Sequence, residues 1–283
     1  MGIAFSSGWQ AGLEVTLEGK RGLTRMAHLR HWGPLRVQRP FYPDNDNHEC
    51  HLYLLHPPGG MVTGDVIQMD IAVENEAHGL LTTPSAGKIY RGNHSDVSQK
   101  QDVVCRVKGR SYLEWMPQET IVFDGARGNL SLRIELESGS NCCLWDIICL
   151  GRPASGEAFT DGYLRQKLEL LVDGALMYSE SNRFEGGSDF LSARWGLAGM
   201  PVSGTLLVSV DVSEDQLTML RERVSVLCVD GEMAVLSNVD GLLSARYLGA
   251  SAEHCKKIFT ACWRELRPLM TGKDIIEPRI WRT

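Results

Sequence analysis

The sequence predicts a mainly β fold, because short stretches of alternating apolar and polar residues dominate its 283 residues. These stretches recur roughly every ten residues and are separated by clusters of Gly, Pro, Asn and Asp, which favour turns. Only two stretches have the apolar spacing of an amphipathic helix, and both lie late in the chain. A sandwich, a barrel and a β-solenoid all fit this pattern, but the lack of a fixed-period repeat argues against a regular solenoid.

The strand candidates follow from alternation, which places successive side chains on opposite faces of a sheet. In residues 130–136 the leucine and isoleucine side chains face one way, while Ser131, Arg133 and Glu135 face the other. Such alternation is typical of a half-buried antiparallel strand. The other candidates, in chain order, are residues 13–17, 66–73, 103–107, 164–171 and 206–210.

Two helices toward the C-terminus are predicted by their starting signals and their apolar stripes. The first opens at Ser213, where Gln216 completes a capping box. The second opens at Ser251 and should end near Pro268, because proline interrupts a helix. Their apolar stripes are expected to pack against the sheets.

The eight cysteines are predicted to be free, mostly buried thiols rather than a disulfide framework. Cys142 and Cys143 are adjacent, so in a strand they point to opposite faces. Cys255 and Cys262 lie on the apolar stripe of the second helix, which favours a core position. This usage indicates a reducing, cytoplasmic setting.

We expect residues 1–283 to form one domain, because no low-complexity linker divides the chain. Residues 186–199 are glycine-rich and are expected to form a long flexible loop. Residues 1–8 lack the basic region of a signal peptide, and no run of about 18 apolar residues could span a membrane. The net charge of −6 argues against nucleic-acid binding, which needs a basic surface.

The common catalytic and metal-binding motifs do not occur. The chain has no Gly-x-Ser-x-Gly, no Gly-x-Gly-x-x-Gly and no phosphate-binding loop. Its eight histidines and eight cysteines do not have the spacing of a zinc site. We therefore expect neither an enzyme nor a tight, closed metal site.

Glycines, prolines and histidines are densest in residues 50–65. His51 and His56 would face opposite sides of a strand and should not share one ion. The Pro-Pro-Gly-Gly sequence between them and Asp65 predicts a tight turn. We predict a hairpin here, with Asp65 as a structural aspartate that begins the next strand.

Asp146 is a carboxylate inside an apolar strand, in the sequence Leu-Trp-Asp-Ile-Ile. Burying an isolated carboxylate costs free energy, so Asp146 must be paired, hydrated in a cavity or protonated. Its simplest partner is Arg152, six residues later, in a structural ion pair. The alternative is that Asp146 lines a polar path within an apolar shell. Glu180, which follows a Leu-Met-Tyr segment, raises the same question more weakly.

Longer motifs resemble one family, the urease accessory protein D family (UreD, also called UreH). They extend from Trp9 to Trp281, nearly the whole chain. The matching segments are residues 33–43, 50–65, 80–84, 88–91, 113–119, 146–153, 266–273 and 278–281. Small departures occur at Thr63, Ser85 and Gly87, which all lie in expected turns.

The resemblance implies a nickel-insertion chaperone with stacked sheets of β-helix-like topology and helices near the C-terminus. The implied partners are apo-urease, accessory protein F and, through F, the GTPase accessory protein G, with no nucleic acid and no membrane. The acidic positions that the family associates with nickel passage look similar to Asp65, Asp146 and Glu180, so these are expected to hold nickel transiently in an internal tunnel. Arg152 shares the motif of Asp146, and no tightly bound cofactor is implied.

The residue types suit a conduit, because carboxylates and water hold nickel loosely whereas clustered thiolates and imidazoles would trap it. The alternative is a purely structural scaffold that only docks the partners. In that case Asp146 and Arg152 would form a stability pair.

Overall fold

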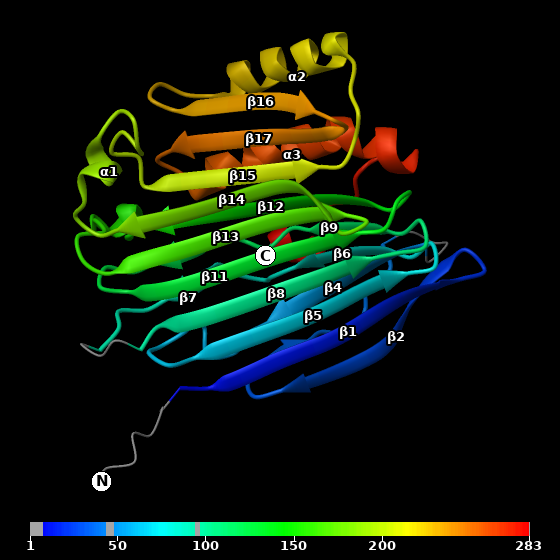
Figure 1. The fold of residues 1–283 in the computed structure, drawn as a ribbon, viewed down its shortest axis with the longest axis horizontal. Coiled ribbons are helices and arrows are strands. Elements are labelled where there is room, and N and C mark those ends of the chain that lie inside the picture. The colour runs from blue at the N-terminus through cyan, green and yellow to red at the C-terminus, as the bar shows by residue number, and fades with distance from the viewer. Residues whose placement is uncertain (1–7, 44–47, 94–96, 283) are drawn as a thin grey trace.

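The structure is a computed structural model that describes residues 8–43, 48–93 and 97–282. The N-terminal segment for which no signal peptide is expected therefore lies almost wholly outside the described residues. Figure 1 shows two stacked β-sheets, with helices gathered at one end of the molecule. The predicted mainly β fold is thus confirmed.

The front sheet in Figure 1 has seven strands in the order β14-β13-β11-β8-β5-β1-β2. Pairs from β1 through β5, β8 and β11 to β13 are parallel, and antiparallel pairs close both ends. The strands are β1 (Gln10–Lys20), β2 (Leu23–Trp32), β5 (Val66–Glu74), β8 (Gln99–Val107), β11 (Arg127–Leu136), β13 (Tyr163–Val172) and β14 (Ala175–Glu185).

The back sheet has ten strands, eight of them in the order β16-β17-β15-β12-β9-β6-β4-β3, with β7 and β10 pairing beside β12. Its strands from β4 to β12 are parallel, and those from β12 to β16 are antiparallel. They are β3 (Arg36–Val37), β4 (Glu49–Leu55), β6 (His78–Thr82), β7 (Gly87–Ile89), β9 (Tyr112–Trp115), β10 (Thr120–Val122), β12 (Asn141–Leu150), β15 (Val202–Val208), β16 (Met233–Val239) and β17 (Leu242–Gly249).

Between β4 and β13 the chain winds repeatedly from one sheet to the other, which gives the expected β-helix-like topology. In the front sheet Val66 pairs with Lys100, Lys100 with Asn129, and Asn129 with Arg165. Successive partners are therefore 34, 29 and 36 residues apart in the sequence. These unequal coils explain why the sequence has no fixed-period repeat.

Two expectations about strand pairing are wrong. Strand β11 shows the predicted alternation of burial, but it pairs in parallel with both neighbours. The alternation survives because the other sheet covers only one face of the front sheet. Residues 50–65 do not form a hairpin, since β4 lies in the back sheet and β5 in the front sheet. The Pro-Pro-Gly-Gly turn instead carries the chain between sheets.

Helix α2 (Glu214–Leu227) begins as the sequence predicts. Ser213 precedes it, and both hydrogen bonds of the capping box with Gln216 are present. The helix buries Leu217, Leu220 and Val224 against the back sheet. Its start and its buried face are therefore confirmed.

Helix α3 (Ala252–Thr271) begins after Ser251, as predicted, but continues past Pro268. It ends at Gly272, which has a left-handed conformation with φ of 67°. A proline in the last turn removes a single backbone hydrogen bond, so it does not end the helix there. No helix in the described residues is long and apolar enough to cross a bilayer.

The segment expected to be a long loop, residues 186–199, is compact instead. It contains the short helix α1 (Asp189–Ser192). Leu197 is buried, and the ring of Phe190 packs 6.3 Å from that of Phe184. These apolar side chains anchor the glycine-rich segment.

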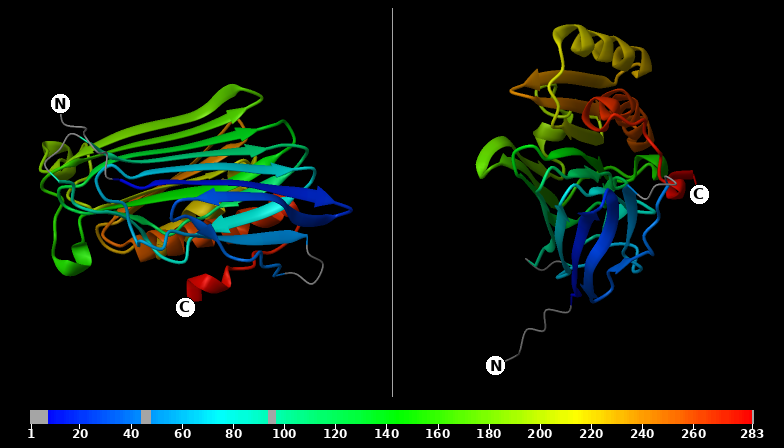
Figure 2. Two further views of the ribbon diagram at one scale, coloured as in Figure 1. Left: turned by 90° about the horizontal axis from the view of Figure 1, so that it is seen from below. Right: turned by 90° about the vertical axis from the view of Figure 1, so that its right-hand side faces the viewer.

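Two hydrophobic cores lie on opposite faces of the back sheet. One fills the space between the sheets, and the other lies under α2 and α3, whose position beside the back sheet is clear in Figure 2. Cys142 belongs to the first core and Cys143 to the second, as alternation predicts. All eight cysteines are free, and Cys255 and Cys262 are buried on the inner face of α3.

Candidate metal-transit site

A cavity with two adjoining chambers lies between the sheets. The larger chamber has a volume of about 300 Å³ and the smaller about 80 Å³. Residues from both sheets line both chambers, and the two chambers share a wall of seven residues. These shared residues are Leu54, Met69, Thr83, Gly87, Gln101, Thr120 and Leu130.

Asp146, on β12, lines the smaller chamber. Its carboxylate accepts a hydrogen bond of 2.8 Å from Nε2 of Gln166, on β13. Burial raises the pKa of Asp146, and the negative charge of Glu180 raises it further, although the Gln166 hydrogen bond opposes both. The sequence left open whether Asp146 is paired, hydrated in a cavity or protonated. The structure places it beside a cavity, with a neutral amide as its hydrogen-bond partner.

Glu180, on β14, is 7% exposed and makes contacts with both sheets. Its carboxylate accepts hydrogen bonds from the hydroxyls of Tyr178 and Thr205, both at 2.9 Å, and from Nδ2 of Asn182 at 2.6 Å. It also forms an ion pair with Arg246, on β17. A charged partner therefore compensates the burial of this carboxylate.

Two amide side chains connect Asp146 to Glu180. Asn182 donates from Nδ2 to Oε1 of Gln166 at 2.9 Å and also to Glu180, while Gln166 donates to Asp146. The result is a continuous chain of hydrogen bonds across three strands. The structure thus brings together two of the three carboxylates expected from the sequence.

Asp65 lies apart from that chain, immediately before β5. It is 2% exposed and accepts backbone hydrogen bonds from Trp9 at 2.6 Å and from Val62 at 2.8 Å. These bonds fix the turn, which is the role of a structural aspartate. Asp65 also acts on His56, which lines the larger chamber: burial lowers the pKa of His56, and the charge of Asp65 partly restores it.

Arg152 does not pair with Asp146, so that expectation is wrong. Its guanidinium pairs with Glu157, with Nε 2.7 Å from Oε2, and stacks 4.8 Å from the ring centroid of Phe123. Strand β12 continues four residues beyond Asp146, about 13 Å at the usual rise per residue. Arg152 therefore lies outside the chamber, in an exposed ion pair.

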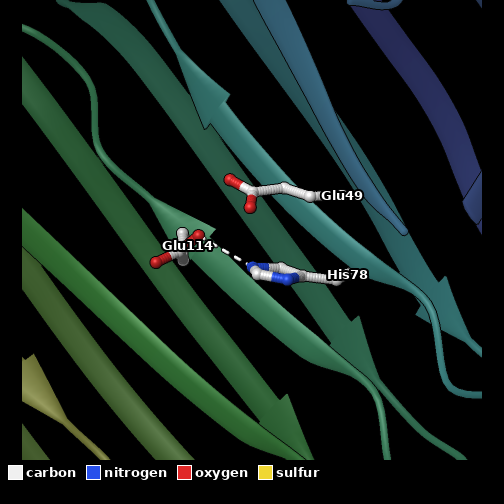
Figure 3. Close-up of side chains that lie close together, drawn as sticks. All are labelled: Glu49, His78 and Glu114. Carbon is white, nitrogen blue, oxygen red and sulfur yellow. Dashed lines mark hydrogen bonds and ion pairs between the residues drawn. The ribbon is translucent and has the colours of Figure 1, made fainter. Parts of the chain in front are cut away.

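A second group of ionisable side chains lies on the α3 side of the back sheet. Glu49 on β4, His78 on β6 and Glu114 on β9 converge, with ligand atoms within 4.8 Å of one another (Figure 3). Parallel pairing brings them together, because Glu49 lies opposite His78. No spacing in the sequence predicts this group, since its members come from three separate strands.

Protein donors already satisfy Glu114. Its Oε1 accepts from Nε1 of Trp263 at 2.5 Å and from Nε of Arg267 at 3.0 Å, and its Oε2 lies 2.8 Å from Nε2 of His78. Burial alone would raise the pKa of Glu114, but His78 and Arg267 outweigh it and lower the pKa to about 2. This carboxylate is therefore held in its ionised form.

Glu49 is satisfied in the same way. One oxygen pairs with Arg267, and the other lies 2.6 Å from Nε2 of His51. A metal ion between Glu49 and Glu114 would have to displace the guanidinium of Arg267, which is fully buried. The group is accordingly an internal ion network that fastens α3 to the back sheet.

A β-solenoid-like scaffold around a partly polar cavity is the class of protein that this fold and site define. The family model described as UreD urease accessory protein matches residues 10–282, and the chain belongs to that family. The resemblance seen in the motifs is confirmed, and membership supports a role in urease maturation.

Curated relatives match the chain over nearly its full length. It is 41% identical over 277 residues to urease accessory protein UreD of Saccharophagus degradans, covering 97% of this chain and 93% of that protein. It is 40% identical over 276 residues to the protein of the same name from Citrobacter koseri, covering 98% and 92%. It is 37% identical over 278 residues to urease accessory protein UreD 2 of Brucella anthropi, covering 98% and 100%.

Proposed function

We propose that this chain is a chaperone that carries nickel to apo-urease through the cavity between its two sheets. In this proposal it docks apo-urease and accessory protein F, and F brings the GTPase accessory protein G. The observation that carries the proposal is the pair of carboxylates, Asp146 and Glu180, joined by amide side chains beside the cavity.

The donor chemistry supports transit rather than storage. Neither cysteine nor histidine is among the described residues that line the smaller chamber, where Asp146 supplies the carboxylate. Oxygen ligands hold nickel less tightly than thiolates or imidazoles do. The raised pKa of Asp146 weakens its hold on a cation further, because a proton competes for the same oxygen.

A cationic side chain also favours brief occupancy. Arg246 pairs with Glu180 and would compete with a divalent ion for that carboxylate. The side chain of Arg246 is 51% exposed, so it has room to move aside when an ion arrives.

The test uses Asp146→Ala and Glu180→Ala, each expressed with urease and the accessory proteins. Both variants should still co-purify with protein F and apo-urease, while the nickel content and activity of urease fall. Glu157→Ala is the matched control, because that acid lies in the exposed pair with Arg152. Normal urease activation by variants that fold and bind their partners would refute the conduit.

A purely structural scaffold is the second candidate, and one observation favours it. Glu180 on the front sheet contacts Thr205 and Arg246 on the back sheet, so it joins the two sheets. A scaffold predicts that Glu180→Ala loses stability and partner binding together. The version of this alternative that relies on an Asp146–Arg152 pair is excluded, because Arg152 pairs with Glu157.

A further inference from the structure

Two stretches of the sequence, residues 33–43 and 278–281, meet although they lie at opposite ends of the chain. They form an open pocket of about 460 Å³ on the outside of the back sheet. Its walls are Gln38, Arg39, Phe41, Tyr53, Arg279 and Ile280. None of these residues lines the cavity between the sheets.

The charge of this pocket is positive. Arg39 and Arg279 are exposed, and neither forms an ion pair among the described residues. No carboxylate is among the lining residues that the structure describes. Within the described part of the chain, no carboxylate pairs with either guanidinium group, so both are open to an anionic ligand.

Tyr53 adds a third donor. The residue is 8% exposed, and its hydroxyl has no hydrogen-bond partner in the described structure. Burial raises the pKa of Tyr53, while the neighbouring backbone N–H groups of Arg279 and Ile280 lower it. Those neighbours are donors, so the hydroxyl hydrogen still lacks an acceptor. A buried hydroxyl is costly to leave unpaired, and an acceptor from outside the chain would satisfy it.

The pocket is held rigidly by the core behind it. The guanidinium of Arg279 lies 5.2 Å from the ring centroid of Phe41. The backbone of Phe41 exchanges hydrogen bonds of 2.8 and 3.0 Å with His51, on β4. Trp281 packs 5.5 Å from the ring of Trp145. Both walls are therefore positioned before any ligand binds, which lowers the entropy cost of binding.

We propose that this pocket binds a carboxylate in an acidic segment of a partner protein. Arg39 and Arg279 would pair with the carboxylate, because a guanidinium matches its geometry. The rings and chains of Phe41 and Ile280 offer apolar contact to the residues beside it. A peptide supplies both kinds of group, whereas a free inorganic anion supplies only charge. This proposal does not depend on the nickel path.

The probe is a fluorescein-labelled, C-terminally amidated peptide that alternates glutamate and leucine, and its binding to the full chain is measured by fluorescence anisotropy. The double variant Arg39→Ala/Arg279→Ala should bind it at least about tenfold more weakly. Tyr53→Phe should weaken binding about threefold or more without changing the charge of the protein. Thermal unfolding of each variant reports whether it has folded.

Arg165→Ala/Arg194→Ala is the matched control, because it removes the same charge from two exposed arginines elsewhere. It should bind the peptide as the unaltered chain does. The proposal is overturned if the Arg39/Arg279 variant keeps full affinity, or if a peptide with glutamine in place of glutamate binds equally well. Efficient displacement of the peptide by millimolar inorganic phosphate would identify a phosphate site instead and would also overturn it.

Discussion

Asp146 is a carboxylate whose ionisation costs free energy in the folded chain. Burial raises its pKa, and the hydrogen-bond donor that it has among the described residues, Gln166, is neutral. By contrast Glu180 has the cation Arg246 beside it. Asp146 therefore holds its proton more firmly than an exposed aspartate does, whereas the charge of Glu180 has a cationic partner.

Asp146→Asn should alter how stability depends on pH. Because the folded-state pKa of Asp146 is raised, the folded chain binds this proton more tightly than the unfolded chain does. The unaltered protein therefore loses stability as pH rises from about 4 through the raised pKa, and an asparagine does not. Urea unfolding at pH 4 and pH 8 should show the variant gaining relative stability at the higher pH. If the unfolding free energy of the variant relative to the unaltered protein stays constant or falls between pH 4 and pH 8, the raised pKa of Asp146 is contradicted.

The site was partly predictable at this scale. An acid within an apolar strand identifies Asp146, since burial of charge is costly wherever it occurs. The partner of Asp146 was not predictable, because Gln166 comes from another strand and Arg152 is carried away by the extended backbone. The orphan hydroxyl of Tyr53 likewise becomes visible only once the two ends of the chain meet.

Helix α3 is attached to the back sheet by a buried ion network in addition to its apolar stripe. Arg267 bridges Glu49 and Glu114, which come from different strands. Gly204 on β15 allows the close approach, because a Cβ there would lie 2.5 Å from Sγ of Cys255. The N-terminal half of α3 thus packs closely on β15, and its C-terminal half is held by the ion network of Arg267.

Arg267→Met should destabilise the protein strongly. The change leaves two buried carboxylates without their cation, which typically costs about 3–5 kcal/mol. Arg264→Met is the control, because Arg264 lies one turn earlier in an exposed pair with Glu277 worth at most about 1 kcal/mol. Urea unfolding at pH 7 measures both. Equal, small losses for the two variants would show that the network does not hold α3.

Local signals predicted the elements better than their pairing. Capping residues set the starts of α2 and α3, and alternation set the buried face of β11. Parallel pairing was missed because one exposed face gives the same alternation in either direction. The end of α3 was missed because a proline in the last turn is tolerated before a glycine that can adopt a left-handed conformation.

At the scale of the molecule, unequal coils create the space that the proposed function needs. The winding of the chain places Leu54 of one sheet opposite Met69 and Leu130 of the other, and all three line both chambers. Strand order is a long-range property, so the cavity could not be located from the sequence. The family motifs identified the fold because they span the chain, but they do not show which residues face inward.

Passage of nickel through the cavity is the central claim, and blocking the cavity tests it most directly. Leu130 lines both chambers and is 7% exposed, so a larger side chain there would obstruct the path without removing a carboxylate. The measurement is the nickel content of urease matured with Leu130→Ala, Leu130→Phe or Leu130→Trp, in complexes shown to be intact by co-purification. The account predicts that nickel content falls as the side chain grows and is preserved with alanine. Full nickel loading by an intact Leu130→Trp complex would contradict it.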